Sequence, residues 1–99
     1  MRSREIKEIL DSARPARGER VILFVAPGAD RVAVIAGKRV GGAVQRNRAR
    51  RVLRAAWQQV ALLAQGRDAV LVARAPILGA KSQDLVVEMT ELLSGAERR

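Results

Sequence analysis

The chain has 99 residues, of which 48% are hydrophobic, and this length supports one domain with a single modest core. It contains no cysteine and no histidine, which excludes disulfides, the common zinc sites, and catalysis by either side chain. No apolar run approaches the roughly 20 residues that span a bilayer, and the first residues lack the apolar stretch of a signal peptide. We therefore expect a single soluble, cytoplasmic domain over residues 1–99.

The first third of the chain predicts a short helix followed by two strands. Ser3 is expected to cap the helix, and a proline and a glycine within residues 14–18 end it. The apolar face of this helix repeats at helical spacing and comprises Ile6, Ile9 and Leu10. Residues 20–26 form a nearly continuous apolar run that predicts a strand, and after turn residues at 27–30 a second strand at 31–36 returns antiparallel to it.

The rest of the chain predicts a long helix, a third strand and a last helix. Residues 37–42 hold three glycines and two cations, and they lead into a helix from about 43 to 64. A third strand at 69–73 precedes a last helix that starts at Ser82 and stops at Gly95. This helix is expected to bury five side chains: Leu85, Val86, Met89, Leu92 and Leu93. The order α-β-β-α-β-α predicts an α+β fold, with a single small sheet and packed helices.

The positive charge of the chain is confined to one stretch. The net charge is +9, and between Asp30 and Asp68 there are nine basic residues and no acidic ones. The remainder has 19 − 9 = 10 basic residues against 10 acidic ones. Such a block attracts a polyanion, whereas a merely solvated face would mix both signs. A membrane-surface helix would need bulky apolar residues beside the charges, and here the core needs the apolar side.

The long helix separates an apolar side from a cationic side. At about 3.6 residues per turn, one stripe forms an ordinary core face: Ala49, Val52, Leu53, Ala56, Val60 and Leu63. A neighbouring arc of about 140° carries polar side chains: Arg46, Asn47, Arg50, Arg51 and Arg54. Arg48 projects from the far flank. Trp57 lies at the edge of the apolar stripe, where we expect partial burial.

The arginines stand where they disfavour the helix. Four of them lie in its first three turns, where the helix dipole costs each cation roughly 0.3–1 kcal/mol. When several residues of one helix are unfavourable for the stability of that helix, they indicate a binding site. Free backbone N–H groups at the helix start favour a phosphate, and Gly41 and Gly42 would let a phosphate backbone approach closely. Asn47 either contacts a base edge or a sugar, or caps the helix.

Residues 38–54 resemble the signature segment of bacterial ribonuclease P proteins. The segment reads Lys38-Arg39-Val40-Gly41-Gly42-Ala43-Val44-Gln45-Arg46-Asn47-Arg48-Ala49-Arg50-Arg51-Val52-Leu53-Arg54. The signature is a basic pair, a glycine, Ala-Val, Arg-Asn-Arg, a further basic pair and another arginine. The resemblance implies an α-β-β-β-α-β-α fold, and in this chain we expect its first strand to be lost or reduced within residues 14–20. It also implies a left-handed crossover around the arginine helix, although packing rules favour a right-handed one.

The resemblance also implies that the chain assists a ribozyme that removes the 5′ leader of precursor tRNA. The RNA subunit would hold the catalytic magnesium, so we expect no catalytic or metal-binding residue in the protein and no obligate protein partner. Eight residues would face the ribonuclease P RNA and nearby substrate: Lys38, Arg39, Arg46, Asn47, Arg48, Arg50, Arg51 and Arg54. Ile6, Leu10 and Phe24 would line a leader cleft between the first helix and the sheet. Members usually carry aromatic residues where Ile6 and Leu10 stand, so Phe24 alone remains to stack on a base.

The sequence leaves two other functions open. A general RNA-binding or ribosomal-type protein would use the same basic helix without any role in cleavage. A protein-based nuclease would instead need clustered acidic ligands for two metal ions. The candidate ligands are scattered and are better explained as solvated caps and turns: Asp11, Glu19, Asp30, Asp68 and Asp84.

Overall fold

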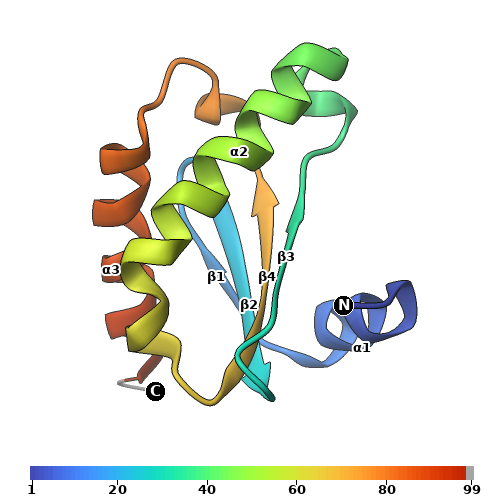
Figure 1. The fold of residues 1–99 in the computed structure, drawn as a ribbon, viewed down its shortest axis with the longest axis vertical. Helices are drawn as coiled ribbons and strands as arrows, with labels where there is room; N and C mark the ends of the chain where they lie inside the picture. The colour runs from blue at the N-terminus through green and yellow to red at the C-terminus, as the bar shows by residue number, and fades with distance from the viewer. Residues whose placement is uncertain (98–99) are drawn as a thin grey trace.

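A computed structural model, which describes residues 1–97, arranges three helices around a four-stranded sheet (Figure 1). The helices are α1 (Ser3–Ser12), α2 (Ala43–Val60) and α3 (Ser82–Glu97). The strands are β1 (Pro15–Arg17), β2 (Val21–Pro27), β3 (Val32–Ile35) and β4 (Arg67–Ala73). Short 3-10 helices cover η1 (Lys38–Val40), η2 (Ala61–Ala64) and η3 (Ala75–Ile77). The order α-β-β-β-α-β-α confirms the α+β class, and the short β1 is the reduced first strand that the resemblance implied.

The strands lie in the order β1-β2-β4-β3, with β4 antiparallel to β2 and parallel to β3. Strands β2 and β3 run in opposite directions as expected, but they do not pair, because β4 lies between them. The turn that joins them is bonded to the start of β4 instead. Gly28 N–H donates to the carbonyl of Gly66 (3.1 Å), and Gly66 N–H donates to Asp30 Oδ1 (2.5 Å).

The connection from β3 through α2 to β4 is a left-handed crossover. In Figure 1, β3 and β4 both run upward, α2 lies in front of the sheet, and β4 stands to the left of β3. The general preference is for the right-handed form. Here β4 is completely buried along Ala69–Leu71 and pairs with β2 over seven residues, so the apolar β4 takes the centre. The four-residue β3 pairs with the other side of β4 and therefore forms the edge of the sheet.

The main core lies between the sheet and the two helices α2 and α3. Its largest fully buried side chains include Leu53 of α2, Leu71 of β4 and Met89 of α3. Trp57 is only 7% exposed, so its burial is more complete than the sequence predicted. Helix α1 packs on the other face of the sheet, against β2 and β4, and buries Ile9. Within residues 1–97, no helix combines the length and the apolarity needed to cross a membrane.

Helix boundaries differ from the prediction at two places near the ends of the chain. Ser3 is the first residue of α1 rather than its cap, and the cap position is Arg2, whose N–H donates to Glu5 Oε1 (3.3 Å). At the other end, α3 continues through Gly95 to Glu97, so this glycine does not stop the helix. A single glycine weakens a helix by only about 1 kcal/mol, and packing of the apolar face outweighs that cost.

The end of the long helix also differs from the prediction, and this changes the core. The α-helix stops at Val60, whose φ of −111° and ψ of −1° depart from α-helical values, and the chain continues as η2 along a changed direction. Leu63, expected in the apolar stripe, is therefore turned outward and 45% exposed. Ala64 takes the core position in its place.

Candidate nucleic-acid interface

The arginines of α2 are displayed on an unbroken helix. Arg48, Arg51 and Arg54 are exposed, while Arg46 and Arg50 are partly buried. Across residues 1–97, the ion pairs are Arg20–Glu88, Arg31–Glu5 and Arg31–Asp68. None involves an arginine of α2, so no carboxylate of the part of the chain that the structure describes neutralises these guanidinium groups.

The arginine row points toward the edge of the sheet formed by β3. Viewed down α2, Arg46, Arg50 and Arg54 are rotated from Leu53 by about 20°, 60° and 100° in the direction of Trp57. That direction leads to β3, because Trp57 lines a pocket of about 240 Å³ together with Asp30 and Arg31. The row of Arg46, Arg50 and Arg54 therefore lies on the side of α2 that is nearer to β3, the outer strand of the sheet.

Arg48 lies on the opposite flank of α2, as expected, and reaches toward α3. Its Nη2 donates to the carbonyl oxygen of Ala80 at 3.5 Å, just before α3 begins. This contact places the exposed Lys81 beside Arg48. Lys81 carries no local signal in the sequence that would have placed it here, because 33 positions separate it from Arg48 and no pattern connects them.

Lys38 and Arg39 lie at the same end of the molecule as the start of α2. Both are exposed on η1, which packs against η3 through the buried Val40 and Ile77. Only two glycines separate η1 from the first turn of α2. We use "basic surface" for the cations that the fold gathers here: Lys38, Arg39, Arg46, Arg48, Arg50, Arg51 and Arg54.

The start of α2 is organised by Gln45 rather than by Asn47. Gln45 Oε1 accepts the N–H of Gly42 (2.5 Å) and so caps the helix, while Asn47 Oδ1 accepts a hydrogen bond from Arg50 Nη2. The capping alternative for Asn47 is therefore wrong, and this amide orients an arginine. Its contact with RNA stays a prediction.

The glycines before α2 do not leave an open space in this conformation. A Cβ atom on Gly41 would lie 2.6 Å from Gln45 Oε1, so the glutamine side chain covers the position where a phosphate was expected to approach. Gly41 is required instead by its backbone, whose φ of 140° disfavours any other residue. The first N–H groups of α2 still face outward along the helix axis, where they favour an anion.

The residues predicted to line a leader cleft lie together on the α1 side of the sheet. Ile6 and Leu10 on α1 and Phe24 on β2 are each partly buried. Phe24 faces α1 because side chains alternate along β2 and its neighbour Leu23 points into the main core. A pocket of about 660 Å³ opens on the other side, between β1, β2 and the end of α3, and none of the predicted site residues lines it.

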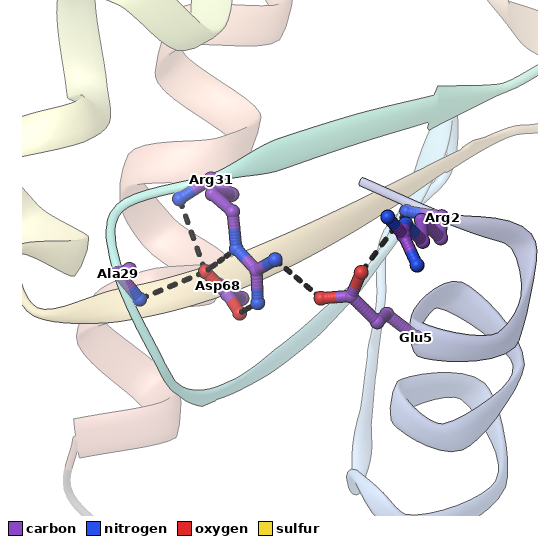
Figure 2. Close-up of polar contacts among 5 residues, drawn as sticks. All are labelled: Arg2, Glu5, Ala29, Arg31 and Asp68. Atoms are coloured by element: carbon purple, nitrogen blue, oxygen red, sulfur yellow. Dashed lines mark hydrogen bonds and ion pairs between the residues drawn. The ribbon is translucent and has the colours of Figure 1, made fainter.

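A cluster of three charged side chains connects α1 to the sheet (Figure 2). Arg31 donates from Nη2 to Asp68 Oδ2 (2.7 Å) and from Nε to Asp68 Oδ1 (3.3 Å). Its Nη1 donates to Glu5 Oε2 on α1. Arg31 was one of the nine cations counted in the basic stretch of the sequence, but its charge is used within the chain.

The cluster fixes the charge states of its members. The Arg31 guanidinium and the N–H of Ala29 lower the pKa of Asp68 from 3.8 to about 2. The hydrogen bond from Arg31, followed by that from the N–H of Arg2, lowers the pKa of Glu5. The two carboxylates in turn raise the pKa of Arg31. All three groups therefore stay ionised at neutral pH.

Three of the five acidic residues considered as metal ligands accept hydrogen bonds from within the chain. Asp84 accepts the N–H of Lys81 (2.9 Å) at the start of α3, and Asp30 accepts that of Gly66, as caps and turns would. Asp68 departs from the expectation of a solvated carboxylate, since it is only 4% exposed and pairs with Arg31. No group of three or more His, Cys, Asp or Glu side chains within residues 1–97 could hold a metal ion.

Comparison with known proteins identifies a family for the chain. The family described as Ribonuclease P matches residues 1–97. A ribonuclease P protein component of Nitratiruptor sp. is 45% identical over 80 residues, which cover 79% of this chain and 72% of that protein. A second ribonuclease P protein component, from Dehalococcoides mccartyi, is 34% identical over 99 residues, which cover 97% of this chain and 82% of that protein.

Solved structures share the fold at lower identity. The RNase P protein of Staphylococcus aureus superposes with a TM-score of 0.81 at 16% identity, covering 97% of this chain and 92% of that one. The RNase P protein of Thermotoga maritima gives a TM-score of 0.80 at 17% identity, covering 94% and 93%. These two likenesses support the fold, including its sheet and three helices within residues 1–97.

Proposed function

The chain belongs to the ribonuclease P family as a protein component of that tRNA-processing endoribonuclease, and from this premise we propose how its surfaces act. The basic surface binds the catalytic RNA of the enzyme and the precursor tRNA near the cleavage site. The apolar surface between α1 and the sheet receives the 5′ leader. The protein thereby assists removal of the leader, while the RNA subunit performs the chemistry.

One observation carries the proposal, namely that the arginines of α2 stand on an intact helix without any carboxylate partner in residues 1–97. A guanidinium has a planar fork of donors that matches two oxygens of a phosphate. A row of such groups releases counterions when it meets a phosphate backbone, and this release drives binding. The cost of placing cations at the positive end of the helix dipole is then offset in the complex.

The role of the α1 side rests on its chemistry. Ile6 and Leu10 offer aliphatic contact area, and Phe24 offers one aromatic face on which a base can stack. Aliphatic contacts carry no base preference, so this surface suits a single-stranded leader of variable sequence. We assign it one stacked base at most, because Phe24 is the only phenylalanine in the chain and Trp57 is buried in the main core.

Magnesium in this proposal belongs to the RNA subunit. The acidic side chains of the described residues do not gather into a group that could hold a metal ion. The contribution of the chain is positioning. Cations next to the RNA active site reduce the electrostatic repulsion between two polyanions, which lowers the concentration of magnesium needed for their association.

Reconstitution with the cognate ribonuclease P RNA tests the proposal. We expect the protein alone not to cleave precursor tRNA, and the RNA plus protein to cleave faster than the RNA alone at low magnesium. The measured quantity is the single-turnover rate of leader release over a magnesium titration. If the protein produces no gain at any magnesium concentration, the chain is an RNA-binding protein of the ribosomal type, without a role in cleavage.

A further inference from the structure

The two ends of α1 are attached to the rest of the molecule in different ways. Its C-terminal half buries Ile9 against the sheet and leads directly into β1. Its N-terminal half has no fully buried side chain. Besides the partly buried Ile6, that half is joined to the sheet by the ion pair between Glu5 and Arg31, which Figure 2 shows reaching from α1 to the start of β3. Among the ion pairs of the described residues, it is the one that joins α1 to the sheet.

Arg31 is a rigid anchor for Glu5 because Asp68 holds the other side of its guanidinium. The Nε and Nη2 atoms bind Asp68, which is buried at the start of β4, and this leaves Nη1 directed at α1. Glu5 also accepts the N–H of Arg2 (3.3 Å), so one carboxylate both caps α1 and fixes it to the sheet. The side chains of Glu5 and Arg31 are 32% and 44% exposed, respectively.

Ile6 follows Glu5 directly and Leu10 lies one turn further on the same face, so the position of Glu5 determines where both stand relative to Phe24. We propose that the Glu5–Arg31 ion pair is a positioning contact that sets the spacing between α1 and the sheet, and thereby the affinity for the 5′ leader of precursor tRNA. This inference rests on the proposed function. Glu5 does not itself touch the leader; it acts through Ile6 and Leu10.

The variant Glu5→Gln separates the ion pair from the cap, since a glutamine oxygen can still accept the N–H of Arg2. The matched control is Glu8→Gln, which removes the same charge from an exposed position of α1 that forms no ion pair within residues 1–97. The reconstituted holoenzyme is titrated with precursor tRNA and with mature tRNA that lacks the leader. The ratio of the Kd for mature tRNA to the Kd for precursor tRNA measures how much the leader contributes to binding. This ratio is unaffected by simple loss of folded protein.

We expect Glu5→Gln to lower this leader-dependent ratio by about two- to fivefold relative to Glu8→Gln, the range that a half-exposed ion pair allows. A second measurement reports α1 directly. Because the chain has no native cysteine, spin labels can be attached to Ser3→Cys on α1 and Gln58→Cys on α2. The distribution of distances between them should broaden in Glu5→Gln and stay narrow in Glu8→Gln.

Equal ratios for the two variants, or equal label distributions, would overturn the inference while leaving the proposed function in place. A wild-type complex that binds precursor and mature tRNA equally well would instead remove the leader-binding part of the proposed function, and with it the link from Glu5 to leader affinity. The label distances would then still decide whether Glu5 positions α1.

Discussion

Asp68 and Arg31 form a paired contact, with Oδ2 to Nη2 at 2.7 Å and Oδ1 to Nε at 3.3 Å, that joins the central strand β4 to the beginning of the edge strand β3. Asp68 Oδ1 also accepts the N–H groups of Ala29 (3.0 Å) and Arg31 (3.1 Å) in the turn between β2 and β3. One buried carboxylate thus holds a turn whose two flanking strands do not pair with each other. Bonds of this kind between ionised partners are shorter and stronger than neutral ones.

Replacing Asp68 by asparagine should destabilise the protein. The amide lacks the charge that matches Arg31 and has only one oxygen that accepts hydrogen bonds, so the turn loses part of its support. We expect the free energy of unfolding to fall by about 1–3 kcal/mol, the cost of losing hydrogen bonds to a charged group, as measured by urea denaturation. Asp11→Asn is the control, because Asp11 is exposed on α1. A loss no larger than that of the control would contradict a structural role for Asp68.

The pKa of Asp68 predicts how stability depends on pH. The folded state lowers this pKa from 3.8 to about 2, so in that interval the unfolded chain binds a proton that the folded chain does not. The stabilisation is complete above pH 3.8 and is lost as the pH falls through about 2. The free energy of unfolding should therefore decrease more steeply between these values in the wild type than in Asp68→Asn. Parallel curves would show that another group dominates acid unfolding.

Replacing Arg46 and Arg50 by alanine should weaken RNA binding for all RNA sequences. Each arginine that contacts a phosphate releases counterions, so the slope of log K against log salt should become shallower by about one to two units. Filter binding or fluorescence anisotropy at several salt concentrations measures this slope. Arg14→Ala serves as control, since Arg14 lies beside the pocket at the far end of α3. A slope identical to the wild-type value would remove Arg46 and Arg50 from the interface.

Gly18→Ala should destabilise the turn between β1 and β2. The added Cβ would meet the Glu88 carboxylate and would lie 2.9 Å from the carbonyl oxygen of Val21. Glu88 accepts the N–H groups of Arg20 (2.9 Å) and Val21 (3.1 Å), so displacing it leaves two donors unsatisfied. We expect thermal unfolding to report a loss of about 1–3 kcal/mol.

The matched glycine variant is Gly37→Ala, because no atom lies within 4 Å of the position of its Cβ. We expect a change within about 0.5 kcal/mol, as for ordinary surface substitutions. Equal effects at the two glycines would mean that the turn can move aside to admit the methyl group.

The tertiary structure decided several features that local reasoning placed wrongly. Asp68 follows a glycine and an arginine and looked like a solvated turn residue, yet it is buried because Arg31, 37 positions earlier, supplies its partner. Leu63 fits the helical repeat but leaves the core because α2 ends at Val60. Lys81 reaches the neighbourhood of Arg48 only through the loop before α3.

By itself, the sequence determined the features that depend on neighbours along the chain. Apolar residues at helical spacing predicted α2 and its core stripe, and the same periodicity predicted which arginines share the neighbouring arc, because both follow from 3.6 residues per turn. The segment at residues 38–54 carried the family resemblance for the same reason. What only the tertiary structure decided was the pairing of distant segments, namely β4 between β2 and β3 and Glu5 held by Arg31. The left-handed crossover was implied by the resemblance alone, since packing rules favour the other hand. Strand order and ion pairs depend on which surfaces meet when the whole core is buried, and no local window of sequence contains that information.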